Sequence, residues 1–262
     1  MVHRFFVPTG SLDRGVAELD GALSHQIADV LRLRQGDSIL LLDNSGWEYE
    51  TTLTGMSPGR TVGTVRSKRL AATEPRVKIT LYHGLIRAQS FEFVLQKCTE
   101  VGVVAFVPMV CERSSVGQLD EIGQEKWGRW QRIVTEAAEQ SHRAKLPVLQ
   151  PAAFFAYACE NARGTSLLAY EDENDQGLCE LLQHVGASAK LGSGSVAARP
   201  FAINLLIGPE GGFSKREVDM ARGYGLHVFG LGPRILRSET AAIVAVSLVL
   251  YELGDLQPGN RQ

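Results

Sequence analysis

The sequence predicts a two-domain α/β protein in which a small β-barrel precedes a domain with a mainly parallel sheet. Residues 1–72 contain short strand-like segments around one helical turn, which is typical of a small barrel. Residues 73–262 alternate strand-like and helix-like segments, which is typical of a parallel sheet covered by helices. The stretch 71–75, which ends in a proline, is the expected boundary.

In the first domain, we expect Ser24 to cap a helix whose apolar face includes Ile27, Val30 and Leu31. Strands are expected over residues 38–42, 47–53 and 61–65, with a turn at residues 43–46.

In the second domain, Ser214 and Glu217 form a capping box that predicts the start of a helix. The segment 186–200 reads as a flexible insertion. Strands are expected over residues 77–82, 103–107, 166–170, 201–207 and 226–229, and further helices over residues 91–101, 124–143 and 239–253.

The bulk composition is that of an ordinary globular protein, with 44% hydrophobic and 21% charged residues. A net charge of −2 argues against tight non-specific binding to nucleic acid, although local basic clusters remain. The longest largely apolar run, residues 241–250, is shorter than the roughly 20 residues that a membrane span needs. The four cysteines show no metal-type spacing. We therefore expect a cytoplasmic protein with no membrane partner and no metal site.

Two glycine-rich loops could carry chemistry. In the first, an apolar strand leads into Gly208-Pro209-Glu210-Gly211-Gly212. Glycines there let the backbone approach a ligand, and the Glu210 carboxylate could bind a cationic group of that ligand. A tight turn without a ligand is the alternative. In the second, residues 230–241, Ser238 could cap the last helix, but Arg234 and Arg237 are unfavourable near a helix N-terminus. Their placement indicates a functional demand, such as a phosphate or a developing negative charge.

In combination these motifs resemble the RsmE-type 16S rRNA uridine-N3 methyltransferases of the SPOUT superfamily. Ser238 stands where that family usually has threonine, and Cys98 where it usually has alanine; both keep the local chemistry. The matching segments are residues 4–7, 97–103, 136–143, 208–214 and 231–241, in the same order along nearly the whole chain.

The resemblance implies a trefoil-knotted catalytic domain at residues 73–262, preceded by a PUA-like RNA-binding barrel at residues 1–72. It implies S-adenosyl-L-methionine as cofactor, small-subunit rRNA or the assembled 30S subunit as partner, and a homodimer formed through the C-terminal domain. Arg237 and Glu210 are the candidate catalytic residues. The implied cofactor-binding residues are Ile207, Gly208, Pro209, Glu210, Gly211, Gly212, Leu231, Gly232, Ile235 and Leu236, and the implied RNA contacts are Arg4, Arg32, Arg34, Arg113 and Arg143.

Three other functions stay open at this point. A SPOUT enzyme that methylates a ribose 2′-hydroxyl in tRNA would share the fold, and a non-catalytic RNA-binding protein would share the first domain. The third is a nucleotide-dependent oxidoreductase, because residues 192–197 formally match GxGxxA. That segment follows no clear strand, and Pro200 prevents a following helix, so the match carries little weight.

Overall fold

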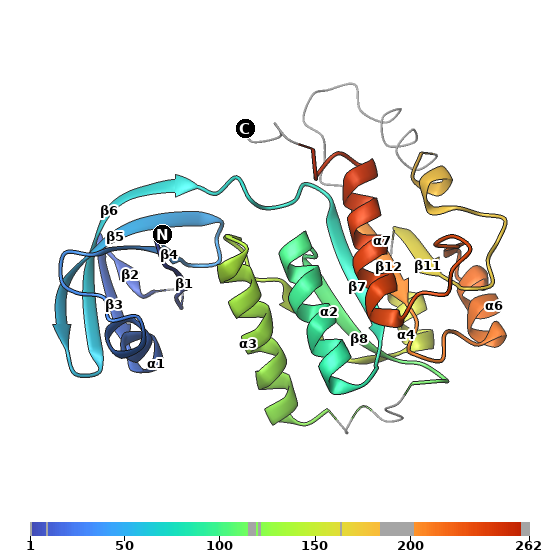
Figure 1. Cartoon of the computed structure of the whole chain (residues 1–262), viewed down its shortest axis with the longest axis horizontal. Coiled ribbons are helices and arrows are strands. Elements are labelled where there is room, and N and C mark those ends of the chain that lie inside the picture. The colour runs from blue at the N-terminus through green and yellow to red at the C-terminus, as the bar shows by residue number, and fades with distance from the viewer. Residues whose placement is uncertain are drawn as a thin grey trace. The chain divides into compact units, whose positions relative to one another are not determined.

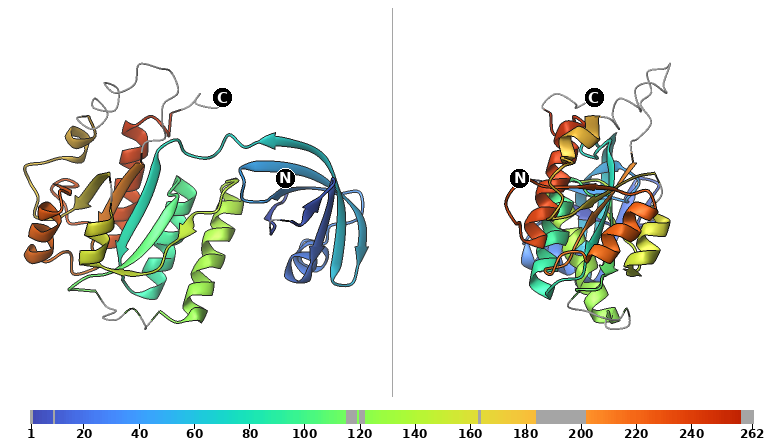
Figure 2. Two further views of the ribbon diagram at one scale, coloured as in Figure 1. Left: turned by 180° about the vertical axis from the view of Figure 1, so that it is seen from behind. Right: turned by 90° about the vertical axis from the view of Figure 1, so that its right-hand side faces the viewer.

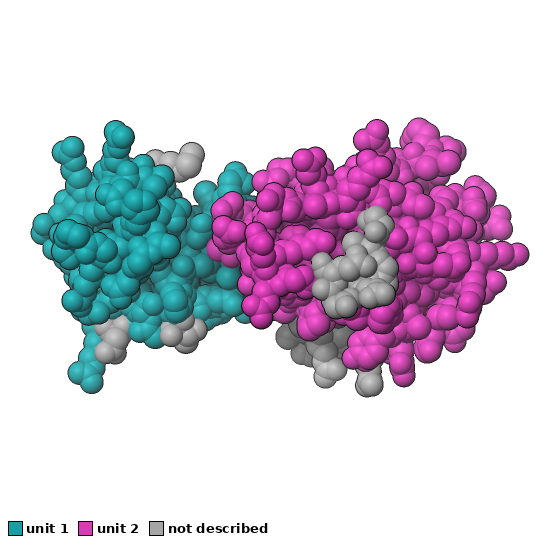
Figure 3. Space-filling view, turned by 90° about the horizontal axis from the view of Figure 1, so that it is seen from below, with its two compact units in different colours: residues 1–74, 138–146 teal, residues 75–137, 147–262 magenta. Residues whose placement is uncertain are grey.

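The computed structural model describes residues 2–8, 10–114, 119, 122–162, 164–183 and 202–257. The expected insertion at residues 186–200, including the 192–197 motif, lies outside the described residues. The chain divides into two compact units, of which unit 1 comprises residues 1–74 and 138–146, and unit 2 comprises residues 75–137 and 147–262 (Figure 3). The division falls after Glu74 instead of residue 72, and residues 138–146, expected in the second domain, belong to the first unit.

Unit 1 is built on a curled, six-stranded sheet (Figure 1). All neighbouring strands are antiparallel except the first pair, β1 and β4. Ser24 lies inside α1 and bonds the Thr61 hydroxyl at 2.8 Å, so it does not cap the helix as expected. In order across the sheet the strands are β1 (Arg4–Phe6), β4 (Ser38–Leu42), β5 (Trp47–Ser57), β6 (Arg60–Leu70), β3 (Val16–Asp20) and β2 (Leu12–Asp13), accompanied by α1 (Gly21–His25) and the π-helical turn η1 (Gln26–Val30).

Residues 138–146 belong to unit 1 because they form hydrogen bonds and an ion pair with residues of the first 74 positions. The Glu74 carboxylate accepts hydrogen bonds from the backbone N–H groups of Ala144 and Lys145 and pairs with the Arg143 guanidinium at 2.9 Å. The backbone N–H of Phe6 donates to Glu139 Oε1 at 3.0 Å. These contacts link positions about 70 to 130 apart in the sequence, which is why no local pattern revealed them.

A buried ion pair stabilises the same part of unit 1. Glu48 is 4% exposed and binds the guanidinium groups of Arg4 and Arg69. Burial alone would raise the pKa of Glu48, but the hydrogen bonds from the two arginines lower it below its ordinary value. Arg4 is therefore held inside the unit by a charged partner.

Unit 2 contains a seven-stranded sheet in which every pairing is parallel, as the alternating sequence predicts. The order is β10 (Ala153–Phe154), β8 (Ala105–Val110), β7 (Lys78–Gly84), β12 (Ala202–Ile207), β11 (Thr165–Ala169) and β13 (His227–Phe229), and β9 (Val148–Leu149) also pairs with β8.

Helices cover both faces of this sheet, so its central strands are apolar on both sides. Figure 2 shows the sheet edge-on, with the red and green helices on one side and the orange and yellow helices on the other. Among the described residues, no helix has the length and apolar character that crossing a membrane requires. The first face is packed by α2 (Ala88–Val101), α3 (Gln124–Gln140) and α7 (Ser238–Glu252), and the second by α4 (Phe155–Asn161) and α6 (Lys215–Gly223).

Candidate active site at the carboxyl ends of the parallel strands

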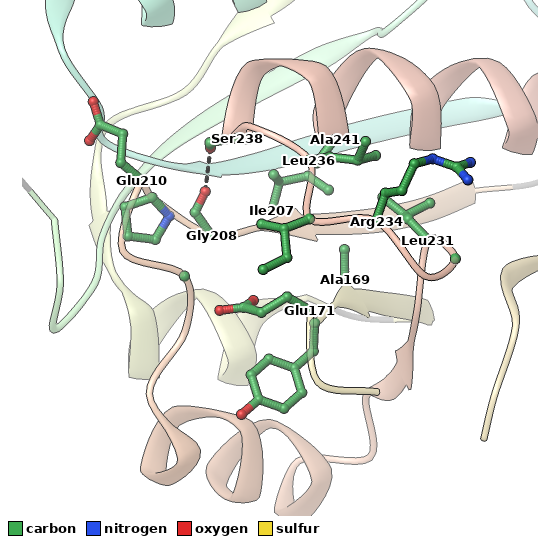
Figure 4. Close-up of a pocket in the computed structure, with 15 residues that line it drawn as sticks. Ala169, Glu171, Ile207, Gly208, Glu210, Leu231, Arg234, Leu236, Ser238 and Ala241 are labelled. Atoms are coloured by element: carbon green, nitrogen blue, oxygen red, sulfur yellow. Dashed lines mark hydrogen bonds between the residues drawn. The ribbon is translucent and has the colours of Figure 1, made fainter. Parts of the chain in front are cut away.

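A pocket in unit 2 lies where β11, β12 and β13 end, which is the usual ligand position in open parallel sheets (Figure 4). Its walls come from the end of β11, from the loop after β12, and from the loop that joins β13 to α7. The lining residues are Ala169, Tyr170, Glu171, Ile207, Gly208, Pro209, Glu210, Gly212, Leu231, Gly232, Arg234, Ile235, Leu236, Ser238 and Ala241.

The helix α6 fixes the far end of the first glycine-rich loop. The predicted capping box is confirmed: the backbone N–H of Glu217 donates to Ser214 Oγ at 3.2 Å, and that of Ser214 donates to the Glu217 carboxylate at 2.8 Å. Glu112 adds a second tie, because Ser214 Oγ donates to Glu112 Oε2 at 2.6 Å. The loop therefore enters α6 in one orientation.

The near end of this loop lies directly on β7. A Cβ atom at Gly84 would come within 2.5 Å of the Pro209 backbone nitrogen and 2.9 Å of the Gly208 carbonyl carbon. Ser238 Oγ donates to the Gly208 carbonyl oxygen at a short distance. Ser238 was expected to cap α7, but it is the first residue of that helix. The N-cap position is occupied by Arg237, whose side chain makes no capping hydrogen bond.

A buried histidine supports this junction. His83 is 1% exposed, and its Nδ1 donates to the Gly84 carbonyl oxygen at 2.7 Å. Its Nε2 lies 3.3 Å from Ser238 Oγ. Burial lowers the pKa of His83 to about 4, so the ring is neutral near pH 7.

Two glutamates line the pocket in different ways. Glu210 Oε1 accepts a hydrogen bond from the backbone N–H of Arg87 at 3.1 Å, at the start of α2, and its carboxylate points away from Ile207 (Figure 4). The Glu171 carboxylate instead points toward the space beneath Ile207 and lies against Gly212, where any Cβ would overlap it. Gly212 also has a φ of +66°, which disfavours other residues. The carboxylate that reaches into the pocket is therefore Glu171.

The structure brings nine of the ten predicted cofactor-binding residues to the pocket wall, and Gly211 is the exception. Gly211 packs against Arg113, whose Nη1 donates to the Gly211 carbonyl oxygen at 2.9 Å. Arg113, predicted to contact RNA, thus also ties down the glycine loop.

The predicted catalytic residue Arg237 is exposed and does not line the pocket, although its neighbours Leu236 and Ser238 do. Arg234 lines the pocket at its edge, and its guanidinium is directed away from Glu171 (Figure 4).

The four other arginines predicted to contact RNA differ in how far their side chains are exposed. Arg32 and Arg34 are exposed, and Arg32 has a φ of +54°, a conformation that is uncommon outside glycine. The side chains of Arg4 and Arg143 are only 7% and 4% exposed, and both are committed to ion pairs inside unit 1. Both guanidinium groups therefore already have a carboxylate partner within the protein.

Several pocket residues went unrecognised in the sequence. Glu171 directly follows the predicted strand 166–170, and this position after a strand end was the one feature of the sequence that could have indicated a binding role. No local sequence pattern marked His83 and Gly84, which support the loop, because Ser238 and Pro209, which they approach, lie more than 120 positions away. Among the described residues, no group of three or more histidines, cysteines, aspartates or glutamates is arranged to hold a metal ion. The unrecognised lining residues are Ala169, Tyr170, Glu171 and Ala241.

Comparison with known proteins identifies the family. Residues 73–250 match the family model of the RNA methyltransferase domain. The chain is 30% identical over 236 residues to the ribosomal RNA small subunit methyltransferase E of Bacillus subtilis, covering 89% of both chains. It is 33% identical over 254 residues to the enzyme of that name from Synechocystis, covering 95% of this chain and 77% of the relative.

The chain belongs to the ribosomal RNA small subunit methyltransferase E family. The fold agrees: the crystal structure of the family member from Neisseria gonorrhoeae, bound to S-adenosyl methionine, superposes with a TM-score of 0.81 at 27% identity, covering 96% of this chain and 98% of that one. The resemblance seen in the loop motifs is thereby confirmed.

Proposed function

We propose that this protein uses S-adenosylmethionine to methylate N3 of a uridine in 16S ribosomal RNA. The observation that carries the proposal is the pocket built from both glycine-rich loops in a chain of this family. The names of the relatives support the small-subunit rRNA substrate, and the methionine-derived cofactor is bound in the Neisseria gonorrhoeae relative. The intact loops argue against a non-catalytic RNA-binding protein.

The pocket fits this cofactor. Ile207, Leu231 and Leu236 offer apolar walls for an adenine, and a Cβ at Gly212 would collide with the Glu171 carboxylate in the pocket wall. We propose that backbone groups of residues 208–212 and 231–236 hold the cofactor, with Gly211 acting through Arg113 and not by direct contact.

We further propose that unit 2 contains the trefoil knot of the SPOUT superfamily. Its support is the tight convergence of three chain segments: Gly84 at the end of β7, Gly208 after β12, and Ser238 at the start of α7. The close approach of Gly84 to the loop leaves no room for a side chain, as expected where one segment passes through another.

The bound cofactor supplies a methyl group on a positively charged sulfur. Uracil N3 carries a proton and attacks only as that proton leaves, so the protein must stabilise the resulting anion. Arg237 is our candidate, because it is exposed between two pocket-lining residues and makes no ion pair in the described part of the chain. Glu210 is a poorer candidate base than its sequence position suggests, since its carboxylate is engaged by the Arg87 backbone.

Unit 1, proposed to be a PUA-like barrel, would position the rRNA. Arg32 and Arg34 are its best phosphate contacts, because they are exposed and close together in sequence. A cytoplasmic location follows from a ribosomal substrate.

A homodimer through α7 is also part of the proposal. This helix is apolar all round: Ala242, Val246 and Val249 are fully buried, while Val244 and Leu248 are partly exposed and Tyr251 is 56% exposed. A second copy of the chain is the proposed cover for these exposed apolar side chains. Light scattering at micromolar concentration should give twice the 28.6 kDa chain mass, and a monomer mass would refute the dimer.

The test is methylation of 30S subunits and of naked 16S rRNA from cells that lack the enzyme, followed by nucleoside mass spectrometry. N3-methyluridine supports the proposal, whereas a 2′-O-methylated nucleoside supports the ribose-methylating alternative.

Arg237→Ala should still bind the cofactor but lose about a hundredfold to a thousandfold in single-turnover rate. Arg216→Ala, an exposed arginine on α6, is the matched control and should keep the rate. A normal rate in Arg237→Ala would remove that residue from the mechanism.

A further inference from the structure

Glu171 occupies a defined place beside the first glycine-rich loop. It comes two residues after the end of β11, whose parallel neighbour β12 leads directly into that loop, with Leu168 paired to Leu206. The Glu171 side chain extends toward the space under Ile207 and meets the Gly212 backbone (Figure 4). An acidic group thus stands at the carboxyl end of one strand, next to a glycine loop on the adjacent strand.

The neighbouring carboxylates already have protein partners. Asp172 accepts a hydrogen bond from the Tyr170 hydroxyl at 3.0 Å, and Glu173 pairs with Arg222 at 2.9 Å. Within the described part of the chain, the Glu171 carboxylate has no hydrogen bond or ion pair. Its two oxygens are therefore available to donors on a ligand in the pocket.

We infer that Glu171 binds the ribose of the cofactor by accepting hydrogen bonds from its 2′- and 3′-hydroxyl groups. This inference rests on the proposed function, which supplies an adenosine in the pocket. In dinucleotide-binding α/β folds, an acidic residue near the glycine loop accepts a ribose hydroxyl in the same way. Two carboxylate oxygens match two adjacent hydroxyl donors.

The placement distinguishes two parts of the ligand, the adenine and the sugar. The apolar side chains of Leu231 and Leu236 suit the adenine, and the glycine backbone at Gly212, against which Glu171 lies, suits a close-packed sugar. A hydrogen bond to an ionised group contributes more than one between neutral groups, so the loss of this contact should be measurable in affinity.

The experiment is a calorimetric cycle with S-adenosylhomocysteine and its 2′-deoxy analogue, using full-length protein. In the wild type, removing the 2′-hydroxyl should weaken binding about tenfold to a hundredfold. Glu171→Ala loses the bonds to both hydroxyls, so it should weaken S-adenosylhomocysteine by at least that factor, and should then bind the two compounds within about twofold of each other. Glu171→Gln should be intermediate, because the amide keeps one neutral acceptor. Asp172→Ala is the matched control and should behave as the wild type.

Each other outcome overturns the inference. Wild-type affinity in Glu171→Ala removes the residue from cofactor binding, and an undiminished preference for the hydroxyl in the weakened variant makes its role indirect. A loss confined to S-adenosylmethionine, with S-adenosylhomocysteine unaffected, would mean that the carboxylate faces the sulfonium instead. If the wild type binds neither compound while binding rRNA, the proposed methyl transfer itself fails, and the ribose contact fails with it.

Discussion

Lowering the pH should destabilise unit 2 through one buried side chain, His83. Its ring is enclosed between the end of β7 and the start of α7, where Nδ1–H donates to the Gly84 carbonyl oxygen and Nε2 faces Ser238 Oγ. Phe91 covers the ring edge at a centroid distance of 5.7 Å. Burial lowers the pKa of His83 to about 4 and outweighs the Gly84 and Ser238 hydrogen bonds and the charges of Glu239 and Glu210, which raise it.

The direction of the effect follows from proton uptake. In the unfolded chain His83 takes up a proton near its ordinary pKa of 6.5, whereas the folded protein resists uptake until about pH 4. Its contribution to stability is therefore complete above pH 6.5 and declines as the pH falls from 6.5 to 4. The shift corresponds to a loss of about 3 kcal/mol across that window.

The assay compares urea unfolding of the wild type and His83→Gln between pH 7.5 and 4.5, together with an NMR titration of the imidazole protons. The variant should be less stable at pH 7.5 but should lose about 2–3 kcal/mol less on acidification, because it has no group to protonate at this position. The two proteins differ only at residue 83, so the difference between their pH profiles isolates the contribution of this position. Parallel pH profiles, or a measured pKa for His83 near 6.5, would refute the reasoning.

Three further substitutions test other contacts. Gly84→Ala forces a methyl group into the loop after β12, so calorimetry should show a cofactor affinity at least tenfold weaker, and unchanged affinity would contradict the close approach. Arg113→Ala removes the tether on Gly211 and should weaken cofactor binding severalfold, with a normal melting temperature; equal affinity would leave Arg113 without a role in the loop. Glu48→Gln removes the charge that two arginines share and should destabilise unit 1 by about 3 kcal/mol in thermal unfolding, while a shift below about 1 kcal/mol would mean that the pair is solvated.

Local sequence patterns predicted the longer strands, the helices α2, α3, α6 and α7, and the two glycine-rich loops, but they missed α4 and the short strands β1, β2, β3, β9 and β10. The alternation of apolar strands and helices predicted the parallel sheet, and the spacing of Ser214 and Glu217 predicted the start of α6. Both depend on residues a few positions apart. Charge was a weaker guide, because a sequence shows which residues are basic and not which are buried. Arg4 and Arg143 were therefore expected on an RNA-binding surface, although the fold pairs Arg4 with Glu48 and uses the Arg143–Glu74 pair to hold residues 138–146 in unit 1.

The two pocket glutamates show why the role of a carboxylate depends on the donors around it. Glu210 sits inside the glycine motif, yet the N–H of Arg87 engages it, and a carboxylate near the N-terminus of α2 is favourable there. That bond fixes the loop and gives the carboxylate a protein partner. Glu171 belongs to no motif, but the strand pairing of β11 with β12 brings it against Gly212 with its oxygens free of protein partners in the described structure. The ligand-binding carboxylate is therefore selected by the sheet, which aligns the ends of two strands, and not by the loop sequence itself.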